Sequence, residues 1–237
     1  MNKIVTDLRN LGIMPDDTLL VHSSLKSLGW VEGGAETVIK ALIAALPTGN
    51  LLMPALTYEY VRIDTPIFSM ADTPSCVGTI PETFRKFPGV IRSVHPTHSV
   101  CAYGINAEEI TARHHLDRTP VGENSPFRQM MKYGGKIMML GCGLMPNTFM
   151  HGVEEATKVP YILESTPTKL IVNGVEVFHY KHHFGSLIQR YDRVTEVCEI
   201  TQGKVLEAEV FIIDAQILWD TATKKVSGEP WFFVSKP

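Results

Sequence analysis

The chain has 237 residues, of which 44% are hydrophobic and 20% are charged, and its formal net charge is −3. This composition is typical of a globular protein with a sizeable core, and the slight negative charge argues against a general nucleic-acid-binding protein. No hydrophobic run approaches the ~20 residues that span a bilayer, and the first residues lack the pattern of a signal peptide. We therefore expect one cytoplasmic domain over residues 1–237, with neither a nucleic-acid nor a membrane partner.

The four cysteines, Cys76, Cys101, Cys142 and Cys198, are scattered and form no CxxC pair. This spacing predicts neither a zinc ribbon nor the disulfide framework of a small secreted protein. We expect reduced, partly buried thiols that pack as small hydrophobic side chains.

The first fifty residues predict a βαβ unit. Residues 5–11 have the pattern of a short helix, and residues 18–22 (TLLVH) form an uninterrupted hydrophobic run typical of a buried strand. A helical segment, 35–46, and a second buried strand, 50–54, follow. Strand, helix and strand in this order predict a parallel pair with a right-handed crossover.

The middle of the chain alternates loops and short regular elements. Loops are expected at 55–75 and 116–127, helices at 78–87, 108–115 and 127–133, and strands at 101–104 and 136–140. Loops beyond strand ends are where α/β proteins keep their functional residues.

The last third of the chain has a different pattern. Residues 168–172, 175–180 and 205–212 are rich in β-branched residues, and Asn173-Gly174 is a strong two-residue hairpin signal. A closing helix is expected at 214–223. We therefore predict an α/β fold in three layers, with a largely parallel or mixed central sheet and an antiparallel C-terminal extension.

A candidate catalytic pair lies in residues 141–155, directly after the buried strand 136–140. His151, Glu154 and Glu155 fall on one predicted helix, where positions three and four apart share a face, so either glutamate can reach the imidazole. A histidine beside a carboxylate is a plausible general base. The competing interpretation is an ordinary contact on a helix surface, because HxxE spacing is common.

The chain has nine histidines, and eight of them gather at His95 and His98, His114 and His115, His151, and His179, His182 and His183. A zinc site needs converging ligands, but no HExxH occurs, and Pro96 prevents His95 and His98 from forming a simple helical pair. We predict no metal. His182 and His183, beside Lys181, are expected on the surface.

Ser23 and Ser24 follow the first buried strand, but the GxSxG pattern of a nucleophile elbow is absent. Hydroxyl groups that cap the next helix are a simpler interpretation. The interpretation that we favour is that small residues at a strand end allow an extended ligand to lie along the backbone. Gly33 and Gly34 at a helix start would suit an anion, although less strongly than a P-loop.

Six segments occur in a characteristic order: VHSSLKSLGWVEGG, LLMPALT, HPTHSVCAYG, GENSPF, GGKIMMLGCG and NTFMHGVEE. From about residue 17 to residue 160 the chain resembles the aminoglycoside N3-acetyltransferase family, the antibiotic N-acetyltransferases. The resemblance is weaker in the C-terminal third. It implies an acetyl-CoA-dependent acyltransferase whose fold differs from that of the GNAT acetyltransferases, and an association with antibiotic resistance.

The resemblance also assigns roles to matching positions. It makes His151 the general base and favours Glu154 as its orienting partner. It places His95 and Ser99 at the acyl-transfer centre or in contact with it. Backbone N–H groups or hydroxyls near Ser23–Leu25, or at Thr148, are the expected donors to the developing oxyanion. Residues implied to line the groove for acetyl-CoA are His22, Ser23, Ser24, Leu25, Val31, Gly33 and Gly34.

The acceptor is implied to be a small amine, and direct transfer in a ternary complex is expected. Tyr58, Glu59, Asp64 and Glu123 are candidates for binding it, but Arg62 and Arg118 in the same loops make these loops only modestly acidic.

The alternatives to an acetyltransferase are a metal-dependent hydrolase using His95, His98 and His151, and a catalytically silent module that binds CoA or a sugar. Either a monomer or a homodimer is compatible with the sequence.

Overall fold

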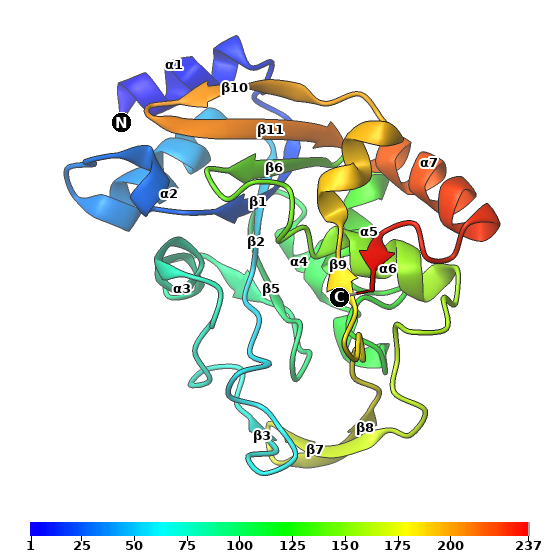
Figure 1. Ribbon diagram of the computed structural model, residues 1–237. Coiled ribbons are helices and arrows are strands. Elements are labelled where there is room, and N and C mark those ends of the chain that lie inside the picture. Colours follow the sequence, from blue (N-terminus) through cyan, green and yellow to red (C-terminus); the bar gives the residue numbers. More distant parts are fainter. Residues whose placement is uncertain (237) are drawn as a thin grey trace.

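The computed structural model describes residues 1–236. Its centre is a seven-stranded sheet with the order β10-β11-β6-β1-β2-β5-β4 (Figure 1). The three middle strands, β1 (Thr18–Ser23), β2 (Asn50–Pro54) and β6 (Lys136–Leu140), run parallel. Helix α2 (Gly34–Ala45) connects β1 to β2, so the predicted βαβ unit is confirmed.

The outer strands of the sheet run antiparallel to their neighbours. β5 (Val100–Gly104) pairs with β2 and with β4 (Ile91–Arg92), while β11 (Ala208–Asp214) pairs with β6 and with β10 (Thr201–Val205). The sequence predicted a single strand at 205–212, and this was wrong. The chain reverses instead at Leu206, whose φ of 52° is a left-handed conformation that is rare for leucine.

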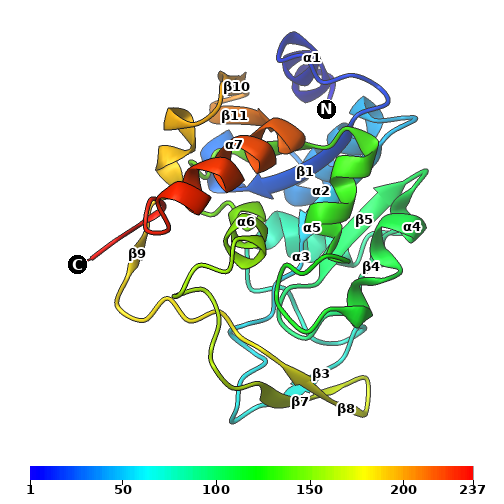
Figure 2. The ribbon, with the colours of Figure 1, turned by 90° about the vertical axis from the view of Figure 1, so that its right-hand side faces the viewer.

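Helices cover both faces of the sheet, which gives the predicted three layers (Figure 2). On one side lie α1 (Asn2–Asn10), α2 and α3 (Thr79–Arg85); on the other lie α4 (Ala107–Thr111), α5 (Pro126–Gln129), α6 (Phe149–Ala156) and α7 (Ala215–Gly228). Leu19 and Val21 of β1 pack into one core and Leu20 into the other. Burial on both faces explains why β1 is a continuous hydrophobic run.

A smaller sheet lies apart from the main one and contains β3 (Ile67–Phe68), β7 (Thr168–Val172) and β8 (Val175–His179) (Figure 1). β7 and β8 form the predicted hairpin, with positive φ at Asn173 and Gly174. The mixed central sheet and the antiparallel strands of the C-terminal third confirm the predicted fold class.

The remaining elements are short. They are the 3₁₀ helices η1 (Lys26–Leu28), η2 (His114–Leu116), η3 (Met130–Tyr133) and η4 (Tyr191–Glu196), and the two-residue strands β9 (Ile188–Gln189) and β12 (Val234–Ser235), which pair with each other. Within residues 1–236, no helix is both long and hydrophobic enough to cross a membrane.

Candidate active site

A cavity of about 650 Å³ lies at the carboxyl ends of the parallel strands. His22 and Ser23 reach it from β1, Pro54 from β2, Cys142 from the turn after β6, and His151 from α6. In α/β sheets ligands bind at this edge, because loops and helix starts converge there.

Close packing fixes the turn and the helix that carry His151. Gly141 has a φ of 70°, and an added Cβ would lie 2.6 Å from Cβ of Ser27. The Ser27 hydroxyl donates to the Gly141 carbonyl at 2.7 Å. Residue 152, which follows His151, is a glycine, and a Cβ at this position would lie 2.9 Å from Cγ1 of Val121. Gly141 therefore allows the turn after β6 to lie against Ser27, and Gly152 allows α6 to lie close to Val121.

His151 and Glu154 are connected through a tyrosine. His151 Nδ1 lies 3.6 Å from Glu154 Oε2, and the hydroxyl of Tyr191 lies 2.7 Å from that nitrogen while donating to the same carboxylate oxygen at 2.6 Å. A tyrosine hydroxyl has one proton, so when it donates to Glu154 it accepts from Nδ1–H of His151. The unprotonated nitrogen of the imidazole is then Nε2, as a general base requires.

Glu154 is completely buried, and the hydroxyl of Tyr161 donates to its second oxygen, Oε1, at 2.8 Å. Burial first, and next the neighbouring Glu154 carboxylate, raise the pKa of Tyr191 and of Tyr161 well above the ordinary value. Both tyrosines therefore remain hydrogen-bond donors that hold the carboxylate in place.

Glu155 has a different partner. Its Oε1 accepts from the backbone N–H of Val121 at 2.8 Å and lies 2.7 Å from Nε2 of His182. Burial raises the pKa of Glu155. The helix spacing left either glutamate open as the partner of His151, and in the structure Glu154 is the one linked to it through Tyr191.

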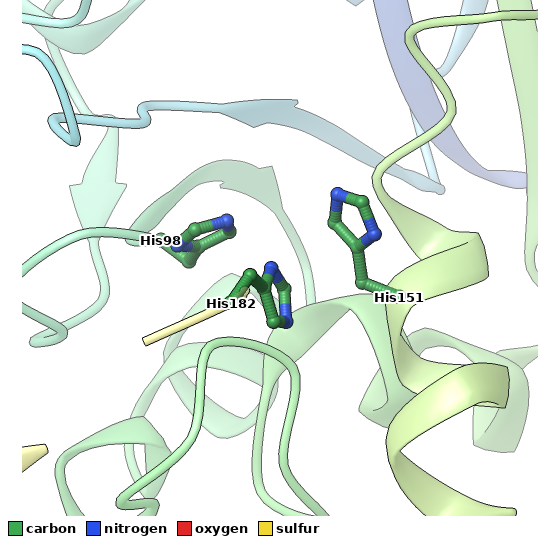
Figure 3. A group of neighbouring side chains, drawn as sticks. All are labelled: His98, His151 and His182. Atoms are coloured by element: carbon green, nitrogen blue, oxygen red, sulfur yellow. The ribbon is translucent and has the colours of Figure 1, made fainter. Parts of the chain in front are cut away.

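His182 does not lie on the surface, so that prediction was wrong, whereas the neighbouring His183 is exposed as expected. The chain that follows β8 returns over α6, and this brings His182 beside Glu155. His98, His151 and His182 gather at the cavity, with one ring nitrogen from each lying within 4.8 Å of the others (Figure 3).

His95 is placed apart from this group and supports the loop before β5. Its ring stacks on His114 with 4.8 Å between centroids, and its Nδ1 accepts from the backbone N–H groups of Thr97 and His98. Burial lowers the pKa of His95 and His98 well below the ordinary histidine value. The imidazole of His95 therefore organises the HPTH turn.

Four side-chain atoms in the cavity wall are buried and have no hydrogen-bond partner within the described residues: Nε2 of His22, Oγ of Ser23, and both amide atoms of Asn147. Burial lowers the pKa of His22 to about 3, so its ring is neutral. Buried polar groups normally have partners. This wall is thus suited to a polar ligand.

The cavity brings together only some of the residues that the sequence proposed. His22, Ser23, Tyr58, Thr148 and His151 line it. The other candidates do not line it, namely Ser24, Leu25, Val31, Gly33, Gly34, Glu59, Asp64, His95, Ser99, Glu123 and Glu154. Glu154 is nevertheless connected to His151 by hydrogen bonds through Tyr191.

The hydroxyl of Ser99 is used in hydrogen bonds within the fold: it donates to the Ala55 carbonyl and accepts from Nε of Arg92.

The charged residues that line the cavity are Arg62 and Lys181, and no carboxylate from the described part of the chain lines it. Tyr161 and Tyr191 were not among the residues predicted from the sequence, because they lie on segments without any recognisable motif.

Comparison with known proteins identifies the fold and the family. The family model described as aminoglycoside 3-N-acetyltransferase matches residues 20–227. The chain is 36% identical over 176 residues to aminoglycoside N(3)-acetyltransferase III from Salmonella sp, covering 67% of this chain but only 61% of that protein. It is 32% identical to aminoglycoside N(3)-acetyltransferase IV from Salmonella sp, covering 99% of this chain and 90% of that protein.

Comparison with solved structures gives the same fold and family. The crystal structure of YokD from Bacillus subtilis superposes with a TM-score of 0.83 at 28% identity, covering 98% of this chain and 94% of that one. A histidine-to-alanine mutant of AAC(3)-IVa in complex with a gentamicin gives a TM-score of 0.85 at 29% identity, covering 98% and 90%. AAC-IIIb with CoASH gives 0.80 at 25%, covering 95% of each chain. The chain belongs to the aminoglycoside 3-N-acetyltransferase family, a family of acyltransferases.

Proposed function

We propose that this chain is an acetyl-CoA-dependent N-acetyltransferase that transfers an acetyl group to an amino group of an aminoglycoside or a related amine. The observation that carries the proposal is the hydrogen-bonded series His151–Tyr191–Glu154, which leaves Nε2 of His151 as the basic nitrogen at the cavity. Complexes of related proteins with a gentamicin and with CoASH support both classes of substrate.

The reaction needs a base because an amine is protonated at neutral pH and is then not a nucleophile. The ammonium form gives up its first proton to solvent, and His151 Nε2 takes a second proton from the free amine as its nitrogen attacks the thioester carbonyl, a general-base step. The new N–C bond forms, the C–S bond breaks, and CoA leaves as the thiolate. The proton on His151 can then pass to this thiolate. Tyr191 and Glu154 hold the ring and stabilise the imidazolium.

The negative charge that develops on the carbonyl oxygen needs hydrogen-bond donors. We assign this role to the Asn147 amide and the Ser23 hydroxyl, which are buried at the cavity without partners. A donor placed in this way typically contributes about 10²–10³ in kcat. Of the donors expected from the sequence, near Ser23–Leu25 or at Thr148, we thus favour Ser23, and we add Asn147.

Direct transfer without an acyl-enzyme agrees with the environment of the cavity thiol. Burial raises the pKa of Cys142 to about 11, so the thiol is protonated at neutral pH. A protonated thiol is a poor nucleophile. We accordingly expect acetyl-CoA and the amine to occupy the cavity together.

The test is release of free thiol from acetyl-CoA in the presence of a panel of aminoglycosides and other amines. We expect His151→Ala to lower the rate by about 10²–10⁴. Because the His151 side chain is only 13% exposed, the variant should also unfold at a lower temperature, and circular dichroism at the assay temperature distinguishes loss of catalysis from loss of fold. Undiminished release in that variant would remove His151 from the mechanism. Radioactive acetyl trapped on Cys142 or Ser23 without an acceptor would replace direct transfer with an acyl-enzyme.

A further inference from the structure

Three imidazoles from distant segments of the chain meet at the cavity (Figure 3). His98 lies in the loop before β5, His151 on α6, and His182 on the segment after β8. One nitrogen from each ring lies within 4.8 Å of the other two. His95, which the sequence grouped with His98 and His151, is not part of this group.

The second nitrogen of each ring already has an oxygen partner. His98 Nδ1 lies 2.9 Å from the Thr97 hydroxyl, and His151 Nδ1 lies 2.7 Å from the Tyr191 hydroxyl. His182 Nε2 lies 2.7 Å from the Glu155 carboxylate. The nitrogens that remain to bind a ligand are therefore Nε2 of His98, Nε2 of His151 and Nδ1 of His182. Histidines that bind metals have this arrangement, since an oxygen partner at the second nitrogen fixes ring and tautomer.

We propose that His98, His151 and His182 form a binding site for a divalent transition metal, with Zn²⁺ as the best match. Zinc takes three histidine nitrogens at 2.0–2.1 Å and leaves a fourth position open, and here that position faces the cavity. Tetrahedral ligands at this bond length are about 3.4 Å apart, so small ring rotations close the site. Ca²⁺ and Mg²⁺ are disfavoured because they prefer oxygen ligands.

The metal would engage the same nitrogen that the acetyl transfer uses. A zinc ion on Nε2 of His151 occupies the lone pair that accepts the proton from the amine. Metal binding and acetyl transfer are therefore mutually exclusive, and zinc inhibits the enzyme. This consequence rests on the proposed function, whereas the metal site itself does not.

Metal binding is tested directly on the purified chain, by titration with Zn²⁺ against a coloured chelator and by the visible absorption of added Co²⁺. We expect one equivalent to bind and tetrahedral or five-coordinate cobalt bands to appear. His98→Gln and His182→Gln should each weaken binding at least tenfold, and Glu155→Gln about 10- to 100-fold. His183→Gln is the matched control, because this exposed neighbour should leave affinity unchanged.

These experiments distinguish failure of the metal-site proposal from failure of the proposed acetyl transfer. Absence of cobalt bands in the unmodified protein, or equal affinity in His182→Gln and His183→Gln, overturns the metal site whatever the enzyme does. The ratio of thiol-release rates with and without zinc, taken for each variant against itself, tests the shared nitrogen. Stoichiometric zinc binding at the three histidines without inhibition would keep the metal site and overturn His151 as the base.

Discussion

The hydroxyl of Tyr191 lies 2.7 Å from Nδ1 of His151, although 40 residues separate the two in sequence. The same hydroxyl donates to Glu154, so it sets both the tautomer and the direction of the imidazole. We predict that Tyr191→Phe lowers kcat by about tenfold or more, a part of the 10²–10⁴ attributed to general-base catalysis. The pH profile of kcat should shift, because the imidazolium loses its link to the carboxylate; steady-state rates across pH measure both effects.

Tyr161→Phe is the control for this prediction. It removes the other tyrosine hydroxyl on Glu154 but leaves the contact with His151 in place. Each variant should lose about 1–3 kcal/mol of stability, the cost of leaving part of a buried carboxylate unsatisfied. Only Tyr191→Phe should change the pH profile. Equal profiles in the two variants would make Tyr191 purely structural.

We predict that Gly152→Ala impairs the enzyme although alanine is the better helix former by about 1 kcal/mol. The added Cβ would lie 2.9 Å from Val121 Cγ1 and 3.4 Å from the Trp219 ring. A β-branched side chain cannot yield easily, so α6 must shift and carry His151 with it. Thermal unfolding and kcat should both fall; an alanine variant that is more stable and fully active would contradict the close packing of α6.

Stability should fall as the pH is lowered below about 6.5. Burial lowers the pKa of His22 and of His114 to about 3, so both rings stay neutral in the fold while the unfolded chain takes up protons at its ordinary pKa. Their contribution is thus complete above the unfolded value and is lost progressively as the pH falls from there towards the folded value. Each can contribute a slope of about 1.4 kcal/mol per pH unit.

Urea unfolding at a series of pH values measures this slope. His114→Gln should reduce it, and His115→Gln, which alters an exposed neighbouring ring, should not. A free energy of unfolding that does not change between neutral and mildly acidic pH would show that these rings are not held neutral.

The charge of the cavity wall bears on which amines react well. Arg62 and Lys181 line it without a lining carboxylate from residues 1–236. Polycationic acceptors are repelled by these groups, so Lys181→Glu should raise kcat/KM for an aminoglycoside by about 3- to 10-fold at low salt, and less at high salt. Lys224→Glu, on the exposed part of α7, is the control. A fall in kcat/KM for the aminoglycoside with Lys181→Glu would point instead to Lys181 contacting acetyl-CoA.

The central sheet was predictable because its signals are local. β1 and β2 are short uninterrupted hydrophobic runs on either side of a helix, and burial on both faces follows from that pattern. The split of 201–214 into β10 and β11 was not predictable, since it depends on Leu206 adopting a left-handed conformation. Tertiary packing determines such a turn.

The candidate site likewise contains some residues that local sequence predicts and others that only the tertiary fold brings together. His151 and Glu154 are three residues apart on one helix, so their proximity could be read from spacing. Tyr191 and His182 reach the site only because the chain after β8 folds back over α6. Nothing local marks those two residues, and a histidine beside Lys181 has the sequence context of a surface residue.

The strand pair β9–β12 anchors the site in the same core as the main sheet. β9 ends two residues before Tyr191 and pairs with Val234 and Ser235. Tyr191, Val194 and Phe233 are buried in the core that also contains the helix with His151. Segments buried in this way open at a free-energy cost close to that of global unfolding. Enzymatic activity and the circular dichroism of the helices should therefore disappear at the same urea concentration.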